Sequence, residues 1–351
     1  MQNLHLITSL LQTNKDFMNI LAIETSCDEA SASVVQNGRK ILSNVISSQI
    51  HIHAKYGGVV PELASRHHLE NINFVVAEAL AKARLRINDI DTLAVTQGPG
   101  LVGSLLAGIM AAKTLSLIYR LPLLPINHIE GHIYANFLEH RIKPPFLALV
   151  ISGGHTELVI QRDHTHYKIL GRTRDDAVGE AYDKVAKLLD LGYPGGPVID
   201  KLAKKGDPQY IKFPRPYLTG SYDFSFSGLK TSVVNYVSKH PASSVQHLAD
   251  VVASFQQAVI EVLVNKTIQT ALKLKMKKIV LAGGVAANSA LRGLFTDKIR
   301  KTGITLYYPS PVLCTDNAAM IGCAAYYRLK NKKLEYNQKI LTFKAAPNLQ
   351  L

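Results

Sequence analysis

A short buried strand, a glycine-rich turn and an apolar helix follow one another twice in this chain, and this repeat limits the folds it can adopt. In the first half, the strand at residues 93–96 leads through QGPGLVGS into a helix predicted over residues 105–119. In the second half, residues 278–281 lead through AGGVAANS into a helix that begins near Ala290. Each half opens with a strand hairpin whose bend is polar or rich in glycine. This order predicts two similar α/β lobes, with ligands bound where the turns meet at the carboxyl ends of the strands.

The remaining segments fit between these units. Hydrophobic residues at helical spacing predict further helices at residues 67–84, 179–189, 227–238 and 244–274. Strands are predicted at residues 20–23, 31–35, 41–46, 121–126, 146–150, 157–161 and 305–308. Of the 351 residues, 47% are hydrophobic and 19% are charged, which is enough to bury a sizeable core and excludes a disordered chain.

The chain is strongly basic, with 40 Lys and Arg against 26 Asp and Glu and a net charge of +14. A polyanionic partner such as nucleic acid and a generally basic proteome explain this balance equally well. The three cysteines (Cys27, Cys314 and Cys323) are odd in number and lack the spacing of a disulfide framework. They argue against a secreted, disulfide-stapled fold and favour a reducing compartment.

No targeting or membrane segment is expected. The longest apolar stretches are interrupted by Gly, Ser or Lys, so we find no run of the ~18 residues that a membrane span needs. Residues 1–17 lack the basic start and continuous apolar segment of a signal peptide and the arginines of a transit peptide. We expect them to be an extension outside the fold, because Met18 stands directly before the first strand.

The strongest candidate for chemistry is the run NHIEGH at residues 127–132. In a helix, His128 and His132 would lie on one face, at a spacing that suits a single metal ion. Glu130 does not fit the zinc-protease motif, because it follows the first histidine by two residues and a helix would turn it off the metal face. A pair of surface histidines is the alternative. The best third ligand is Asp316, which precedes a helix-like run, and two histidines with one carboxylate would leave positions open for substrate.

The glycine-rich turns are the second candidate. Residues 152–156 (SGGHT) and the pair Gly283-Gly284 each follow a strand, and bare glycines let backbone N–H groups approach phosphate oxygens. The chain has neither a Walker lysine nor the dinucleotide-binding fingerprint, and tight packing of the turns is the alternative. Asp183 and Asp200 flank the turn YPGGP and suit hydrogen bonds to ribose hydroxyls, although solvated helix faces carry such acids routinely.

Taken together, nine ordered blocks of the chain resemble one family. They are NILAIETSCDEASASVV (19–35), YGGVVPELASRHH (56–68), QGPGLVGSLLAG (97–108), NHIEGH (127–132), VISGGHTELV (150–159), GEAYDKVAKLLDLGYPGGP (179–197), FSFSGLKT (224–231), AGGVAANSALR (282–292) and CTDNAAMIG (314–322). The blocks are similar to TsaD, the family of tRNA N6-adenosine threonylcarbamoyltransferases, over residues 18–329. The YPGGP block is similar to the bacterial and organellar branch. Ala30 stands where the family usually has Thr, and this position is not among the ligands that the resemblance implies.

The resemblance implies a fold and a function. The fold is the duplicated actin-like ATPase (ASKHA) fold, an α/β architecture of two lobes with mixed sheets flanked by helices and a central cleft. We would divide the chain into an extension (1–17), an N-terminal lobe (18–126 plus 322–351) and a C-terminal lobe (127–321). The function is transfer of the threonylcarbamoyl group from threonylcarbamoyl-AMP to N6 of the adenosine beside the anticodon, in tRNAs that read codons starting with adenine, which forms t6A.

The resemblance also implies site residues and partners. His128, His132 and Asp316 would hold one divalent metal ion per subunit, with Fe²⁺ expected and Zn²⁺ as the alternative. Residues that would contact the adenylate of threonylcarbamoyl-AMP, or ATP, are Val150, Ile151, Ser152, Gly153, Gly154, Asp183, Gly196, Asp200 and Asn288. No protein nucleophile is implied, because the donor is already an activated anhydride. The expected partners are tRNA, TsaB-like and TsaE-like proteins and a TsaC-like enzyme that supplies the intermediate, in the cytoplasm and without a membrane; a homodimer is an alternative.

Two other functions stay open at this point. A metalloprotease would need Glu130 beside the metal, which its spacing disfavours. A regulatory or chaperone-like ATPase would use the cleft as a switch and would turn over ATP without an acyl acceptor.

Overall fold

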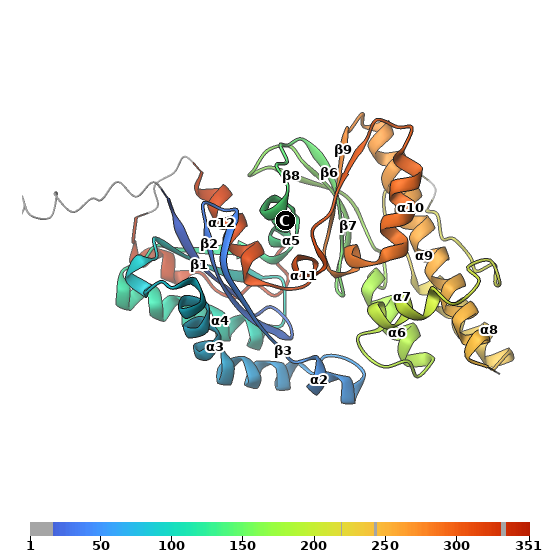
Figure 1. Ribbon diagram of the computed structural model, residues 1–351, viewed down its shortest axis with the longest axis horizontal. Coiled ribbons are helices and arrows are strands. Elements are labelled where there is room, and N and C mark those ends of the chain that lie inside the picture. The colour runs from blue at the N-terminus through green and yellow to red at the C-terminus, as the bar shows by residue number, and fades with distance from the viewer. Residues whose placement is uncertain (1–16, 219, 242–243, 331–334) are drawn as a thin grey trace, which may run out of the picture.

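The computed structural model describes residues 17–218, 220–241, 244–330 and 335–351, and two five-stranded sheets form its framework (Figure 1). The first sheet has the strand order β3-β2-β1-β4-β5 and the second the order β10-β9-β6-β7-β8. The first comprises β1 (Asn19–Glu24), β2 (Glu29–Gln36), β3 (Lys40–Ser48), β4 (Thr92–Gly98) and β5 (Leu123–Asn127). The second comprises β6 (Phe146–Ile151), β7 (Thr156–Gln161), β8 (Tyr167–Arg172), β9 (Lys278–Ala282) and β10 (Thr305–Tyr307).

The two sheets repeat the same pairing, which confirms the predicted duplication. β1 pairs antiparallel with β2 and parallel with β4, just as β6 pairs antiparallel with β7 and parallel with β9. In each sheet an antiparallel third strand (β3 or β8) and a parallel outer strand (β5 or β10) complete the order. The carboxyl ends of the parallel strands β1, β4, β6 and β9 therefore carry the polar and glycine-rich turns predicted to bind ligand.

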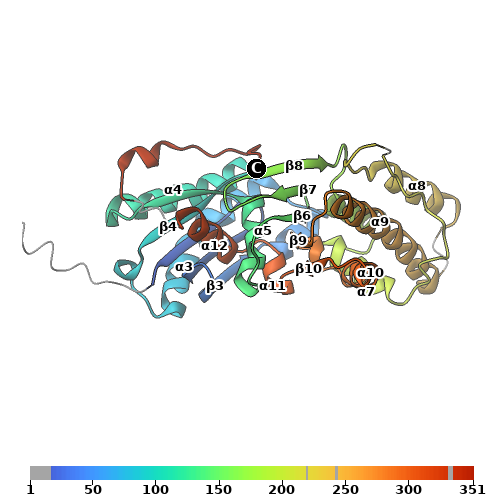
Figure 2. The same cartoon turned by 90° about the horizontal axis from the view of Figure 1, so that it is seen from above.

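Helices cover the outer faces of both sheets and fill the space between them (Figures 1 and 2). The α-helices are α2 (Ile50–His53), α3 (Pro61–Ala83), α4 (Val102–Tyr119), α5 (His128–Glu139), α6 (Val178–Leu188), α7 (Gly195–Ala203), α8 (Ser227–Lys239), α9 (Val245–Lys273), α10 (Ser289–Ile299), α11 (Pro311–Cys314) and α12 (Ala318–Leu329). Short 3-10 helices are η1 (Ala54–Tyr56), η2 (Ile87–Asp89), η3 (Gly284–Ala287) and η4 (Gln338–Thr342).

Three cores hold these layers together. α3 and α4 pack on the first sheet, and α6 to α10 pack on the second. α5 and α12 share a core with strands of both sheets, including Ile20 of β1 and Phe146 of β6. The two helices therefore form the layer that joins the lobes. The predicted lobe boundaries at 126/127 and 321/322 fall at the start of α5 and inside α12, and the division itself stays a prediction.

Most predicted elements are present, and the differences are local. The helix predicted from residue 67 begins at Pro61, a residue that favours the first helical turn. Strand β8 and helices α2, α7 and α11 were not predicted: β8 lies at the sheet edge with few buried residues, α7 starts with two glycines, and α2 and α11 have four residues each. The predicted extension at residues 1–17 lies almost wholly outside the described residues.

Two helices are long and apolar enough to cross a membrane by length and composition, contrary to the expectation that no run reaches that size. They are α4, with 39% of its residues buried, and α9, with 78% of its most apolar window buried. Both pack on sheets of the fold, and the core helices of globular domains pass the same test.

Candidate functional site

The two histidines of the NHIEGH run lie at the start of α5. The Asn127 side chain accepts hydrogen bonds from the backbone N–H groups of Ile129 (2.8 Å) and Glu130 (3.3 Å) and so caps the helix. Because the helix begins at His128, His128 and His132 stand one turn apart on the same face, with ring centroids 4.6 Å apart. The predicted helical spacing is confirmed.

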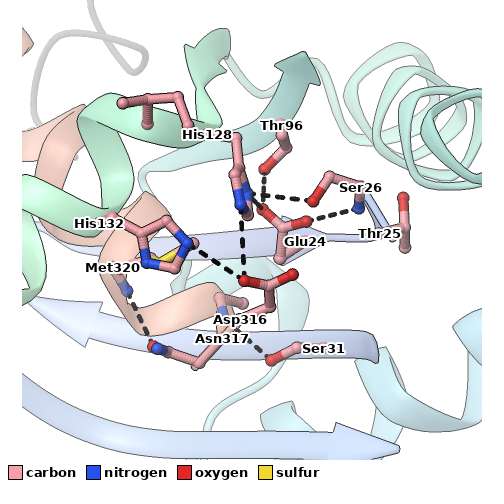
Figure 3. Close-up of polar contacts among 12 residues, drawn as sticks. Glu24, Thr25, Ser26, Ser31, Thr96, His128, His132, Asp316, Asn317 and Met320 are labelled. Atoms are coloured by element: carbon pink, nitrogen blue, oxygen red, sulfur yellow. Dashed lines mark hydrogen bonds and ion pairs between the residues drawn. The ribbon is translucent and has the colours of Figure 1, made fainter. Parts of the chain in front are cut away.

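Asp316 comes to the same place from the turn before α12 (Figure 3). Its Oδ1 lies 3.5 Å from Nε2 of His128 and 3.2 Å from Nε2 of His132. The turn is held by Asn317, which caps α12 by accepting from Met320 N (3.1 Å), and by the Ala318 N–H, which donates to Ser31 Oγ (2.9 Å). One donor atom from each of the three residues lies within 4.8 Å of the others, so the structure brings the three predicted ligands together.

A buried carboxylate that the sequence did not single out supports this cluster. Glu24, at the end of β1, is fully buried, and its Oε2 lies 3.0 Å from Nδ1 of His128. The same carboxylate accepts hydrogen bonds from Ser26 N and Thr96 Oγ1, both at 2.5 Å. Glu24 therefore leaves Nε2 of His128 free to face Asp316. The only signal in the sequence was an acid at the carboxyl end of a buried strand.

The two histidines differ in their electrostatics. Burial lowers the pKa of His128, but the carboxylates of Glu24 and Asp316 outweigh burial and raise it to about 9. Burial and the neighbouring His128 lower the pKa of His132. Both ring nitrogens of His132 are buried and make no hydrogen bond within the described residues. The lowered pKa favours the neutral, ligating form of His132, whereas at His128 an ion would have to displace the proton that the carboxylates hold. Two imidazoles and one carboxylate are a donor set that a divalent transition metal takes, so the residues fit such an ion.

A cavity of about 1040 Å³ opens beside this cluster, between the turns of the two sheets. Predicted site residues that line it are Ser152, Gly153, Gly154, Asp183, Gly196, Asp200, Asn288, His128 and Asp316. Val150 and Ile151 do not line it, because they are fully buried in β6, and the buried His132 does not line it either. A side chain added at Gly153, Gly154 or Gly196 would meet no atom within 4 Å, so these turns expose bare backbone to the cavity.

Asp183, Asp200 and Asn288, the polar side chains predicted to contact the adenylate, also hold the turns in place. Asp183 Oδ1 accepts from the Gly195 N–H (2.7 Å) at the start of α7, and Asp200 accepts from Ser289 N (3.2 Å) at the start of α10. Asn288 caps α10 through Leu291 N (2.8 Å) and donates to the Gln256 side chain (2.8 Å).

Burial raises the pKa of Asp183 to about 6, although the Gly195 N–H lowers it. Asp183 is therefore an acceptor that ionises close to neutral pH.

Sequence reasoning missed an acidic pair on the opposite wall. Asp28 and Glu29 follow β1 and line the cavity. Burial and the neighbouring Asp28 raise the pKa of Glu29 to about 10. Burial, Asp28 and Asp316 also raise the pKa of the Cys27 thiol, so Cys27 is not an activated thiolate.

Glu130 lies outside the cavity. Its buried carboxylate pairs with Arg328 of α12, and neither residue lines the cavity. It is therefore not placed to activate water at the cluster, as a metalloprotease would require.

Comparison with known proteins decides the family. The family model described as TsaD, tRNA N6-adenosine threonylcarbamoyltransferase, matches residues 40–323. The chain belongs to this family. A relative from Endomicrobium trichonymphae named tRNA N6-adenosine threonylcarbamoyltransferase is 54% identical over 339 residues, covering 95% of this chain and 98% of the relative. One of the same name from Clostridioides difficile (strain 630) is 55% identical over 334 residues, covering 94% and 98%. The chain is thus a TsaD-family transferase of tRNA modification.

Solved structures agree on the fold. Full-length HypF in its phosphate- and nucleotide-bound form has a TM-score of 0.60 at 14% identity, covering 89% of this chain and 55% of that one. Component A of the (R)-2-hydroxyglutaryl-CoA dehydratase of Acidaminococcus fermentans has a TM-score of 0.52 at 15% identity, covering 89% and 99%. These proteins have the actin-like ATPase fold, which confirms the fold class expected from the sequence.

Proposed function

We propose that this TsaD-family chain takes threonylcarbamoyl-AMP as donor and attaches its threonylcarbamoyl group to N6 of the adenosine beside the anticodon, in tRNAs that read codons starting with adenine. The observation that carries the proposal is one cavity lined both by His128 and Asp316 of the histidine–aspartate cluster and by bare glycine turns. The first suits a divalent cation and the second suits an adenylate phosphate.

The chemistry needs little from the protein beyond placement. The N6 amine attacks the carbamoyl carbon, a C–N bond forms, the C–O bond to the phosphate breaks, and AMP leaves with the electron pair while N6 loses a proton. Negative charge grows on the carbamoyl oxygen and on the departing phosphate. The open backbone at Gly153 and Gly154 offers N–H donors for such charge, an effect worth on the order of several kcal/mol.

His128, His132 and Asp316 would hold the metal ion, with Fe²⁺ as the expected metal and Zn²⁺ as the alternative. The bound ion would supply Lewis-acid stabilisation of an oxygen of the donor. Asp183 and Asp200 would accept hydrogen bonds from the ribose, Gly196 would let the adenylate approach, and Asn288 would complete the floor. For Val150 and Ile151, which are buried, we propose support of the turn at residues 152–154 in place of direct contact.

We further propose partners from the surfaces. Lys187, Lys201 and Lys204 stand exposed at the cavity rim and would meet tRNA phosphates. On α4, Val102, Leu106 and Met110 follow one another at intervals of four residues and are 57%, 45% and 57% exposed. We propose this stripe as the docking face for a TsaB-like protein, with TsaE-like and TsaC-like proteins completing the cytoplasmic pathway.

The test is a direct assay. The chain is incubated with threonylcarbamoyl-AMP, unmodified tRNA and the partner proteins, and digested nucleosides are analysed by mass spectrometry. We expect t6A with the wild type and at least a hundredfold less with a folded His128→Ala variant. Absence of t6A with the wild type, under conditions where another family member makes it, would contradict the proposal and favour the switch-ATPase alternative.

A further inference from the structure

Helices α5 and α12 approach each other closely beside the metal cluster. They lie next to each other between the two sheets in both views (Figures 1 and 2). A Cβ added at Gly131 would lie 2.7 Å from Ile321 Cδ1 and 3.2 Å from Met320 Cγ of α12. Gly131 stands between the two histidines, and Asp316 immediately precedes α12. The spacing of α5 and α12 therefore sets the distance from the histidines to the aspartate.

An ion pair between Glu130 of α5 and Arg328 of α12 also joins these two helices. Arg328 Nε lies 3.0 Å from Glu130 Oε1, and Arg328 Nη2 lies 2.5 Å from Glu130 Oε2. The Glu130 side chain is 1% exposed and that of Arg328 is 38% exposed. The guanidinium thus contacts both carboxylate oxygens, through a charge-assisted hydrogen bond to Oε1 and an ion-pair contact to Oε2.

Two further contacts extend this pair to both sheets. The Tyr167 hydroxyl of β8 donates to Glu130 Oε1 (2.8 Å), and Arg328 Nη1 donates to the carbonyl of Pro125 (3.2 Å) in β5. The pair therefore connects α5 and α12 to a strand of each lobe, Glu130 to β8 and Arg328 to β5. Neither Glu130 nor Arg328 lines the cavity, so the pair acts through the two helices and does not contact the substrate.

We propose that Glu130 and Arg328 form a positioning pair that holds the two histidines at the distance from Asp316 that a divalent cation requires. The inference rests on the metal site of the proposed function. Loss of Arg328 would leave a buried carboxylate without its charge partner, and loss of the Glu130 charge would remove the group that holds the guanidinium against α5. Either change is expected to shift α12 against α5 and to move Asp316 with it.

The experiment measures Zn²⁺ affinity of the full chain by competition with a chromophoric chelator, together with thermal unfolding of the metal-free protein. Glu130→Gln keeps the shape but places an amide N–H₂ against the guanidinium. Arg328→Lys keeps the charge but loses the planar fork. The control is Glu261→Gln on α9. It breaks the partly buried ion pair of Glu261 Oε2 with Arg215 Nε (2.8 Å), and neither residue lines the cavity.

We expect Glu130→Gln to weaken Zn²⁺ binding by roughly tenfold or more, as loss of a supporting residue around a metal site does. Arg328→Lys should weaken it in the same direction. Glu261→Gln should lower the unfolding temperature while Zn²⁺ affinity stays unchanged, which separates positioning from general stability. If Glu130→Gln does not fold, the Zn²⁺ affinity of Arg328→Lys tests the proposal.

Unchanged Zn²⁺ affinity in the folded Glu130 or Arg328 variant would overturn the positioning role and leave the proposed metal site intact. A wild type that binds no Zn²⁺, Fe²⁺ or Co²⁺ would overturn the metal site and this inference with it.

Discussion

Nδ1 of His128 lies 3.0 Å from Oε2 of Glu24, so a carboxylate at the end of β1 decides which ring nitrogen of the histidine faces Asp316. Carboxylates that accept from the outer nitrogen of a ligating histidine fix its tautomer and orientation. We expect Glu24→Gln to weaken metal binding by about 10- to 100-fold. Metal content after dialysis against a buffered free metal concentration measures this. The control is Glu62→Gln, an exposed acid of α3, and equal metal content in both variants would contradict the role of Glu24.

Metal removal should lower the stability of the fold. An ion that binds only the folded chain stabilises it by about 2.7 kcal/mol at a free concentration a hundred times its dissociation constant. Thermal unfolding with and without a chelator should therefore show a clear shift for the wild type. His132→Ala should unfold at one temperature in both conditions, because its Nε2 is 3.2 Å from Asp316 and within the cluster. A shift retained by the variant would place the metal elsewhere.

Gly131 and Gly293 are both helical glycines with opposite surroundings. An added Cβ meets Ile321 Cδ1 at 2.7 Å in the first case and no atom within 4 Å in the second. Ala favours a helix over Gly by about 1 kcal/mol, so Gly293→Ala should stabilise the chain. Gly131→Ala should destabilise it by about 1–3 kcal/mol through overpacking of α5 against α12. Urea unfolding compares the two; a stabilising Gly131→Ala would mean that the helices can separate freely.

The C-terminal residues fasten the glycine turn after β4. Ala346 N donates to Gln97 O (2.9 Å), and Gly100 N donates to Pro347 O (3.1 Å). Gly98 has a φ of +157°, and a Cβ there would lie 1.9 Å from Ala346 O.

We expect Gly98→Ala to destabilise the chain by about 1–3 kcal/mol, because a backbone atom cannot give way. Gly303→Ala is the control: its φ is +68°, but its surroundings are open. Thermal unfolding of both variants separates the cost of backbone strain from the cost of the contact with Ala346 O. Equal losses of stability in the two variants would show that the C-terminal contact contributes nothing.

Asp175 should give the stability of α8 a dependence on pH. Its carboxylate accepts from Phe226 N (2.8 Å) and Ser227 Oγ (2.7 Å) at the start of that helix. Burial raises the pKa of Asp175, but the hydrogen bonds from Ser225, Phe226 and Ser227 outweigh burial and hold it below the ordinary value of 3.8. Because the folded pKa is the lower one, the ionised form contributes stability above pH 3.8, and this contribution is lost as the pH falls through the folded pKa.

Asp175→Ala should cost about 1 kcal/mol at neutral pH, as loss of a helix cap does. The difference from the wild type should shrink in acid, and urea unfolding at a series of pH values measures it. A loss that is independent of pH would assign the effect to packing and not to the charge.

Local patterns predicted much of the fold because they depend on neighbours in the chain. The spacing of His128 and His132 needs only a helix to bring the rings together, and Asn127 before them provides its cap. Strand and helix periodicity likewise predicted the duplicated order, and the nine blocks indicated the family. β8 was missed because its own pattern is weak and the sheet edge decides its conformation. α7 was missed because it is short and begins with Gly-Gly-Pro, which indicates a turn.

The sequence by itself determined the two lobes, the family and the histidine pair, because these follow from periodicity and motif order. Only the tertiary structure decided that Glu24 supports His128, that Glu130 pairs with Arg328 of α12, and that Val150 and Ile151 lie beneath the cavity. These relationships join residues far apart in the chain, and no local pattern specifies which face of a helix or strand a distant element will cover. The packing of the two sheets around α5 and α12 specifies it, since a buried charge is tolerated only where the fold supplies its partner.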